Sequence, residues 1–130
     1  MNTMDVGRRL VELCKEGKNR QAIEELYADT VDVQEPMPMP GKSNGPRSKE
    51  DILKDSDEFF DMMEIHGGEI DGPYPWQDKV IVFMSLDATP KEGPMAGQRI
   101  DMREACVYRV RDGKIQESHF CYEVPEGACS

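Results

Sequence analysis

The sequence contains few of the residues from which metal centres and disulfide frameworks are built. Its 130 residues include two histidines and four cysteines, and no two cysteines have the Cys-x-x-Cys spacing. A zinc site needs close pairs of Cys or His ligands, and a disulfide framework needs regularly spaced cysteines. We therefore expect no metal and no disulfide framework, with the thiols reduced as is usual in the cytosol.

Long apolar runs and an excess of positive charge are also missing. No apolar run approaches the ~20 residues that span a bilayer, and no apolar stretch follows the arginines of MNTMDVGRRL as it would in a signal peptide. The formal net charge is −10 at pH 7, whereas nucleic acids and anionic membranes attract clustered Lys and Arg. The sequence thus predicts a cytoplasmic protein with neither a nucleic-acid nor a membrane partner.

The composition is that of one globular domain. Charged residues make up 32% of the chain and apolar residues 38%, unlike disordered chains of high charge and low hydrophobicity. A chain of this length can form one hydrophobic core, and no internal repeat divides it. We expect a single domain over residues 1–130.

Apolar residues recur at helical spacing in the first half of the chain. A first helix is expected from a cap at Thr3 to a C-terminal cap at Gly17. A second, short helix has an apolar stripe that ends at Tyr27, and Ser48 begins a capping sequence for a third. The residues expected on the buried face of this third helix are Ile52, Ser56, Phe59, Phe60 and Met63.

The second half of the chain alternates with the period of β-strands. Strands are expected at 79–89, 97–111 and 114–123, after a short strand at 31–35 and a loop at 37–46. The dipeptide Asp112-Gly113 is typical of a two-residue hairpin turn. Because helices and strands are segregated, the sequence predicts an α+β fold with three helices on one face of a curved, mostly antiparallel sheet.

The segment VQEPMPMP places a carboxylate between a strand and three prolines. The proline that follows Glu35 restricts the backbone of Glu35 to extended conformations and so fixes its direction. The apolar neighbours Met37 and Met39 would raise the pKa of the Glu35 carboxyl by excluding water, which suits a general base near neutral pH. The alternative is a solvated glutamate at the end of a strand.

Three stretches give the chain a family resemblance. They are AIEELYADTVDVQEP, YRVRDGKIQESHFCYE and the turn around Gly17. Together with the order of helices and strands, they resemble the SnoaL-like branch of the superfamily that includes nuclear transport factor 2 and the ketosteroid isomerases. The resemblance covers nearly the whole chain. It implies a cystatin-like roll, in which the sheet forms a cone around an internal pocket.

The resemblance implies a position for the site but only a class of reactions. Glu35 falls where ketosteroid isomerases carry their general base. Their oxyanion-binding tyrosine falls at about Leu10, and their hydrogen-bonding aspartate falls near Ala105 and Cys106, so neither group carries over. We expect a cofactor-free acid–base enzyme (isomerase, dehydratase or cyclase) acting on a small apolar organic molecule, or alternatively a non-catalytic binding or dimerisation module.

The hairpin around Asp112-Gly113 supplies further candidates. Counting from the turn pairs Tyr108 with Glu117, and Cys106 with His119, on one face together with Glu104. The opposite face carries Arg103, Phe120 and Tyr122, and the sequence does not decide which face lines the pocket.

The candidate catalytic residues are Glu35, His119, Tyr108 and Arg103. The expected pocket lining is Met37, Phe59, Met63, Trp76, Phe120 and Tyr122.

The strand at 79–89 is apolar on both faces, with Val80 and Val82 on one face and Ile81 and Phe83 on the other. A sheet that is covered by helices on one side only should show polar residues on its outer face. We therefore expect a homodimer in which a second copy covers the outer face.

Overall fold

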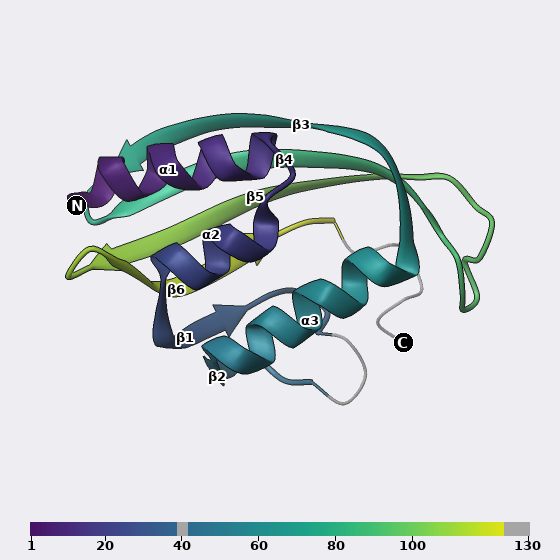
Figure 1. The fold of residues 1–130 in the computed structure, drawn as a ribbon, viewed down its shortest axis with the longest axis horizontal. Helices are drawn as coiled ribbons and strands as arrows, with labels where there is room; N and C mark the ends of the chain where they lie inside the picture. Colours follow the sequence, from purple (N-terminus) through teal and green to yellow (C-terminus); the bar gives the residue numbers. More distant parts are fainter. Residues whose placement is uncertain (39–41, 124–130) are drawn as a thin grey trace.

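The computed structural model describes residues 1–38 and 42–123, and over these residues three helices lie on one face of a six-stranded sheet (Figure 1). The helices are α1 (Thr3–Lys15), α2 (Asn19–Leu26) and α3 (Lys49–Met62). The strands are β1 (Tyr27–Gln34), β2 (Gly45–Ser48), β3 (Met63–Trp76), β4 (Lys79–Pro90), β5 (Ile100–Arg111) and β6 (Lys114–Cys121).

The strand order is β2-β1-β6-β5-β4-β3, and neighbouring strands are antiparallel except for β1 and β6. The predicted α+β class and the mostly antiparallel sheet are confirmed. In Figure 1 the long strands curl behind α1 and α2, while β1, β2 and α3 form the lower part of the molecule.

The helices begin and end where local side chains satisfy their free backbone groups. The side chain of Asn2, one residue before the expected Thr3, accepts a hydrogen bond from the N–H of Asp5 at 2.8 Å and so caps α1. At the other end, Gly17 has a φ of 74°, and the N–H of Lys18 donates to the Leu13 carbonyl at 2.8 Å. This is a C-terminal cap that favours glycine, as predicted.

The core lies between α1, α2 and the inner face of the sheet, which is the face that the helices cover. The apolar side chains with 0% exposure come from both layers: Val6, Val31, Val80, Val82, Ala88, Cys106 and Ile115. Helix α1 approaches the sheet closely at Gly7, where a Cβ atom would lie 2.9 Å from Val80 Cγ1. Any larger residue at position 7 would push α1 away from β4.

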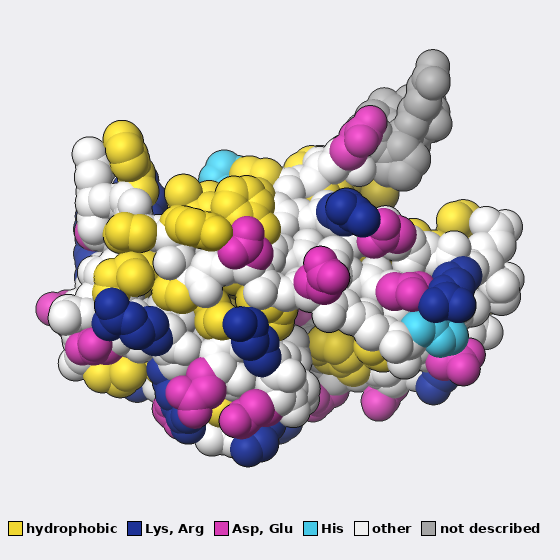
Figure 2. Space-filling model, turned by 90° about the horizontal axis from the view of Figure 1, so that it is seen from above, with side chains coloured by type: hydrophobic (Ala, Val, Ile, Leu, Met, Phe, Trp, Pro, Cys, Tyr) yellow, Lys and Arg dark blue, Asp and Glu magenta, His cyan; other side chains and the backbone are white. Residues whose placement is uncertain are grey.

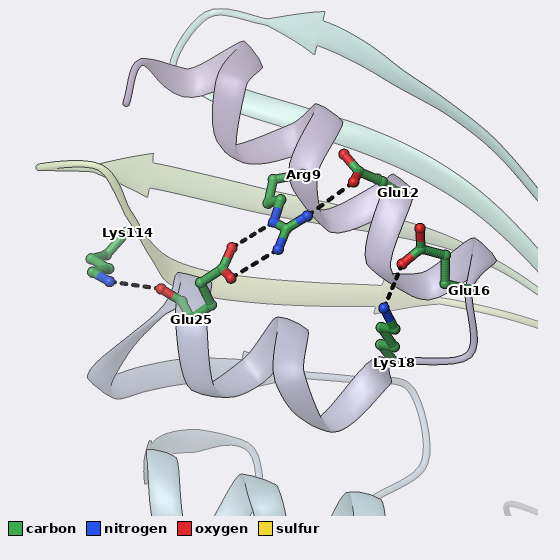
Figure 3. A network of polar contacts seen from close by, with 6 residues as sticks. All are labelled: Arg9, Glu12, Glu16, Lys18, Glu25 and Lys114. Carbon is green, nitrogen blue, oxygen red and sulfur yellow. Dashed lines mark hydrogen bonds and ion pairs between the residues drawn. The ribbon is translucent and has the colours of Figure 1, made fainter.

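A network of ion pairs joins the first two helices on their solvent side (Figure 3). Arg9 donates to both carboxylate oxygens of Glu25, at 2.7 and 3.1 Å, and to Glu12 at 3.0 Å. The Lys114 ammonium donates to the Glu25 backbone carbonyl at 2.7 Å. These contacts hold α2 against α1 and against the start of β6.

Two strands were not expected from the sequence. β2 begins within the last two residues of the predicted loop at 37–46 and continues to Ser48, and β3 covers residues that precede the first predicted strand of the second half. β2 has four residues, too few for a periodic signal. β3 contains Gly67, Gly68 and Gly72 as well as Pro73 and Pro75, residues that are tolerated because β3 is an edge strand with irregular register.

The buried face of α3 also differs from the expectation. None of the α3 side chains is fully buried, and Phe60 is 36% exposed. Helix α3 covers the end strands β1 and β2 and the start of β3 rather than the centre of the sheet. It therefore covers one side of the curled sheet and keeps one flank in water.

The hairpin turn lies where it was predicted, but the register that we count from it is wrong. Both residues of Asp112-Gly113 have positive φ, at 53° and 71°, as a tight hairpin turn requires. A β-bulge then leaves Gln116 without a partner, so that Tyr108 faces Ser118 rather than Glu117. One extra residue turns every later side chain of β6 to the opposite face.

The internal pocket stays a prediction. A hollow of about 520 Å³ lies on the outer side of β3 to β5, and another of about 190 Å³ lies between the α1–α2 turn and α3. Residues 1–38 and 42–123 contain no helix that is long and apolar enough to cross a membrane.

Candidate functional site

Polar residues gather on the inner face of the sheet, beyond the apolar core. Alternation along β1 continues from Val31 and Val33 to Glu35, which is half-buried. On β5 the same face carries Glu104, and Tyr122 lies opposite Glu104 just after β6. These side chains form the polar end of a surface that is otherwise apolar.

The backbone of Glu35 is held in place by Asn44. The side-chain amide of Asn44 accepts from the Glu35 N–H and donates to the Glu35 carbonyl, each at 3.0 Å. Because Val33 pairs with Gly45, the Asn44 amide continues the β1–β2 ladder by one more pair. Glu35 therefore has a defined direction although it lies beyond the end of the strand.

Tyr122 fixes the chain on the other side of Glu35. The Tyr122 hydroxyl accepts from the Met37 N–H at 3.2 Å and donates to the Met37 carbonyl at 3.0 Å. The backbone after Glu35 is thus bound to β6 as well as to Asn44. The predicted neighbour Met39 and the third proline, Pro40, lie outside the described residues.

Two carboxyl groups in this region have altered acidity. Burial raises the pKa of Glu35, and the negative charge of Asp55 raises it further, while Lys42 and Arg47 oppose the shift. Burial is also the main cause of the raised pKa of Glu104, to which the charge of Glu35 adds. The predicted direction for Glu35 holds, and a second carboxyl shares its environment.

A cluster of opposite charges flanks Glu35 on the α3 side. Arg47 on β2 donates to Asp55 Oδ2 at 2.6 Å, and Lys42 binds the other oxygen of the same carboxylate. The side chains of Arg47, Lys42 and Asp55 are 19%, 30% and 30% exposed. Charges at this degree of burial are screened less than those at the surface.

Tyr108 lies deeper on the inner face, where it is 3% exposed. Its ring meets that of Phe120 edge to face, with 6.2 Å between the centroids. Burial raises the pKa of the Tyr108 hydroxyl well above its ordinary value, and burial also raises that of the Cys106 thiol. Both shifts favour the protonated forms of these two groups, and a protonated thiol is a poor nucleophile.

Two of the candidate catalytic residues lie on the outer face. His119 faces Val107, not Cys106, because of the bulge, and it is exposed. Arg103 pairs with Asp101 at 3.0 Å and is 79% exposed. The expected constellation of Tyr108 with His119 and Glu117 on one face is therefore wrong, because the sheet separates Tyr108 from the other two.

The expected pocket lining is also divided. Phe120 and Tyr122 lie on the inner face, Phe59 is half-buried on α3, and Met63 is buried where β3 begins. Met37 is 40% exposed beside Glu35, whereas Trp76 is 61% exposed at the far end of β3. The register places Trp76 level with Arg109 and Glu117, at the opposite end of the sheet from Glu104.

With this geometry in view, the chain can be compared with known proteins. The model of a family described as SnoaL-like domain matches residues 1–122. The chain belongs to the SnoaL-like domain family. No curated protein matches it.

Solved structures agree with this SnoaL-like assignment. A Mesorhizobium loti protein provisionally named a SnoaL-like polyketide cyclase is 32% identical; the match covers 94% of this chain and 100% of that one, with a TM-score of 0.84. A SnoaL-like polyketide cyclase from Agrobacterium tumefaciens is 13% identical (95% and 92% covered, TM-score 0.71). A Bacillus subtilis protein provisionally named an isomerase is 16% identical (95% and 90% covered, TM-score 0.71). The last two show a shared fold.

Sequence reasoning placed Glu104 of this SnoaL-like domain on the face of Tyr108 without choosing it as a catalytic candidate, and it did not consider Arg47 or Asp55. The signal for Glu104 was present, because it alternates with Cys106 and Tyr108, both apolar enough for a core strand. No comparable signal existed for Arg47, which lies on a strand of four residues, or for Asp55, which lies in an acidic helix.

Proposed function

We propose that this SnoaL-like domain is a cofactor-free acid–base enzyme of the isomerase, dehydratase or cyclase class, acting on a small apolar organic molecule within the cone. The observation that carries the proposal is the pair of inner-face carboxyls, Glu35 and Glu104, both with raised pKa. Such shifts are typical of groups that exchange protons near neutral pH. The names of the structural relatives, polyketide cyclases and an isomerase, point to the same chemistry.

The two carboxyls have different surroundings and can take different roles. Glu35 lies near two cations, Lys42 and Arg47, which favour its ionised form, so it is the base that removes a proton from carbon. Burial and the charge of Glu35 both favour the protonated form of Glu104, so it is the acid that returns a proton. Different environments for two neighbouring carboxyls divide the roles in this way. Tyr108 is a further neutral donor on the same face.

Proton removal can be tested without knowing the natural substrate. The measurement is hydrogen–deuterium exchange next to the carbonyl of a panel of small cyclic ketones, followed by NMR in D₂O. Glu35→Gln keeps the shape and removes the basicity, so exchange should slow by about 10²-fold or more. Glu64→Gln, an exposed glutamate on β3, is the matched control and should exchange at the wild-type rate.

The competing proposal is a binding module without catalysis. It is favoured by Leu10, which has no donor where ketosteroid isomerases carry a tyrosine. If the ketones exchange no faster with the wild-type protein than with Glu35→Gln, while an apolar ligand still binds both, the binding module replaces the enzyme.

We also propose a homodimer through the outer face of the sheet. Apolar side chains are exposed there on adjacent strands: Tyr74 at 46%, Phe83 at 48% and Trp76 at 61%. Tyr74 and Phe83 are in contact, with ring centroids 5.9 Å apart, and Figure 2 shows hydrophobic side chains gathered towards one end of the molecule. A contiguous exposed apolar surface is typical of an interface, and a two-fold axis would bring the same surface of a second copy against it.

Sedimentation velocity at micromolar concentration tests the dimer. Phe83→Asp places a charge in the centre of the surface and should give a monomer that keeps its helical circular dichroism. A wild-type protein that sediments as a monomer would remove the proposal.

A further inference from the structure

Arg47 is an unusual arginine because it points towards the helix side of the sheet. Arg47 pairs with Val31 across β1 and β2, and Val31 is fully buried on the inner face. Residues that are directly opposite in neighbouring strands project to the same face. Arg47 therefore extends beneath α3 rather than into water, which is consistent with its 19% exposure.

The hydrogen bonds of Arg47 are incomplete. Its Nη2 donates to Asp55 Oδ2 at 2.6 Å, but its Nε is buried and has no acceptor among residues 1–38 and 42–123. A buried donor without a partner is destabilising, more so when it is charged, and native proteins leave few of them. An oxygen from outside the described chain would satisfy this N–H.

The guanidinium also acts on Glu35. Its positive charge opposes the rise in the pKa of the Glu35 carboxyl, so the two groups share one region of the inner face. No ion pair joins Glu35 to Arg47 in the part of the chain that the structure describes. The base and the cation are therefore near each other, with each still able to contact a third group.

We propose that Arg47 binds the carbonyl oxygen of the substrate through its Nε–H and stabilises the negative charge that develops there during proton removal. Glu35 accepts the proton from the adjacent carbon, the C–H electron pair forms a carbon–carbon double bond, and the carbonyl electron pair moves to oxygen. The enolate oxygen then accepts the charge-assisted hydrogen bond. The substrate class is thus a carbonyl compound with an acidic C–H bond. This inference rests on the proposed function.

Arg47 would supply the oxyanion-binding donor that the resemblance to ketosteroid isomerases does not provide. The tyrosine and the aspartate that bind the oxyanion in ketosteroid isomerases have no counterparts at Leu10 and at 105–106. A fixed positive donor near the developing charge contributes the same electrostatic stabilisation. Asp55 holds the guanidinium in place, and it also lowers the net charge that the substrate meets.

The test uses 4-nitrophenol, whose coloured phenolate resembles an enolate in charge and shape. The wild-type protein should bind the phenolate in preference to the phenol, which an absorbance titration at fixed pH measures directly. Arg47→Gln should weaken phenolate binding roughly 10- to 100-fold, the loss expected for one charge-assisted hydrogen bond. Arg8→Gln removes the same charge from an exposed site on α1, where Arg8 is 65% exposed, and should change nothing.

Arg47→Lys controls for a loss of folding in Arg47→Gln. Lysine keeps the positive charge and can still reach Asp55, but it has no Nε–H in the same place. Phenolate affinity should fall for this variant as well, with an unchanged thermal midpoint. Wild-type affinity in either Arg47 variant, or no phenolate binding by the wild-type protein, overturns the proposal.

Glu35→Gln separates this inference from the proposed function. Removing a neighbouring negative charge should raise the affinity for the phenolate if Glu35 faces the same ligand. If the affinity is unchanged in Glu35→Gln and lost in Arg47→Gln, Arg47 binds an oxyanion at a site where Glu35 is not the base. The proposed function then fails while the binding role of Arg47 stands.

Discussion

Both faces of the sheet carry carboxyl groups, but the pKa of a carboxyl shifts in opposite directions on the two faces. On the outer face Asp87 is paired with Arg99 through two hydrogen bonds of 2.8 and 2.6 Å, and this pairing lowers the pKa of the Asp87 carboxyl. On the inner face burial raises the pKa of Glu104. An arginine partner favours the ionised form of a carboxyl, whereas burial beneath helices favours its protonated form.

Position along a strand therefore decides which residues are chemically useful. Arg103, Arg109 and Glu117 are all charged and close to the hairpin, but they pair with neighbours on the water side. Pairs of this kind contribute little to stability. Glu104 is adjacent to Arg103 in the chain, and the alternation of β5 alone separates their surroundings.

The largest effect is expected when one negative charge is placed on the inner or on the outer face of β4. Val82→Asp puts a carboxylate at a position with 0% exposure, where an unpaired charge costs several kcal/mol. A domain of this size has a free energy of unfolding of about 5–15 kcal/mol. We expect Val82→Asp to be largely unfolded by circular dichroism.

Phe83→Asp is the matched control on the next residue of the same strand. Its side chain is 48% exposed, so the carboxylate stays hydrated and the fold should survive. Equal loss of structure in both variants would mean that the outer face is as buried in solution as the inner one, as in a dimer whose monomer does not fold.

A smaller effect is expected from the two tyrosines that bind to the chain on opposite faces. Tyr122→Phe removes the hydroxyl that holds the Met37 backbone next to Glu35. Ketone exchange should slow by about tenfold, since a small displacement of a catalytic group is costly. The loss of stability should be only about 1 kcal/mol.

Tyr74→Phe serves as its control. The Tyr74 hydroxyl donates to Asp71 at 2.6 Å on the outer side, so its removal changes one surface hydrogen bond and leaves Glu35 in place. If Tyr74→Phe slows exchange as much as Tyr122→Phe, the effect of Tyr122 is not a matter of positioning Glu35.

The fold could be predicted from the sequence where periodic patterns are long. The alternation of Val80, Val82 and Met84 identified β4 and its buried face, and Ser48 marked the start of α3 through its hydrogen bond with the Asp51 N–H at 3.1 Å. β3 was not predicted, because glycine and proline interrupt its alternation of apolar and polar residues. Pairing with β4 overrides that local preference, which a single sequence does not show.

The candidate site was predicted less completely than the fold, because its prediction depends on the register of β6 and a bulge at Gln116 changes that register. Glu35 was proposed because a proline follows it and because ketosteroid isomerases carry their general base at the matching position. The partners of Glu35 depend on register, and the bulge at Gln116 reverses the faces of β6 beyond the turn. Nothing in the residues around Gln116 marks a bulge, so His119 was expected beside Tyr108 although the sheet lies between them.

The smallest expected effect concerns the pH dependence of stability. The pKa of Glu104 is raised in the folded chain above its ordinary value of 4.5, so the folded state binds more protons than the unfolded state above that pH. Stability must then fall as the pH rises through the folded pKa, because ionising Glu104 beneath the helices is unfavourable. The shift is opposite in sign to that of a paired surface carboxylate such as Asp87.

Glu104→Gln isolates this contribution, since every other titrating group remains. At roughly pH 4, where the wild-type carboxyl is protonated in both states, the two proteins should have similar thermal midpoints. Towards pH 7 the variant should become more stable than the wild type by a few degrees, because only the wild type must keep a charge at this position. Glu117→Gln on the outer face should show no such gain, since Glu117 forms an ion pair with Arg109 at 2.9 Å. A midpoint difference that is the same at both pH values would mean that Glu104 is ionised without cost, and that the two faces of the sheet do not differ in the way that proton transfer requires.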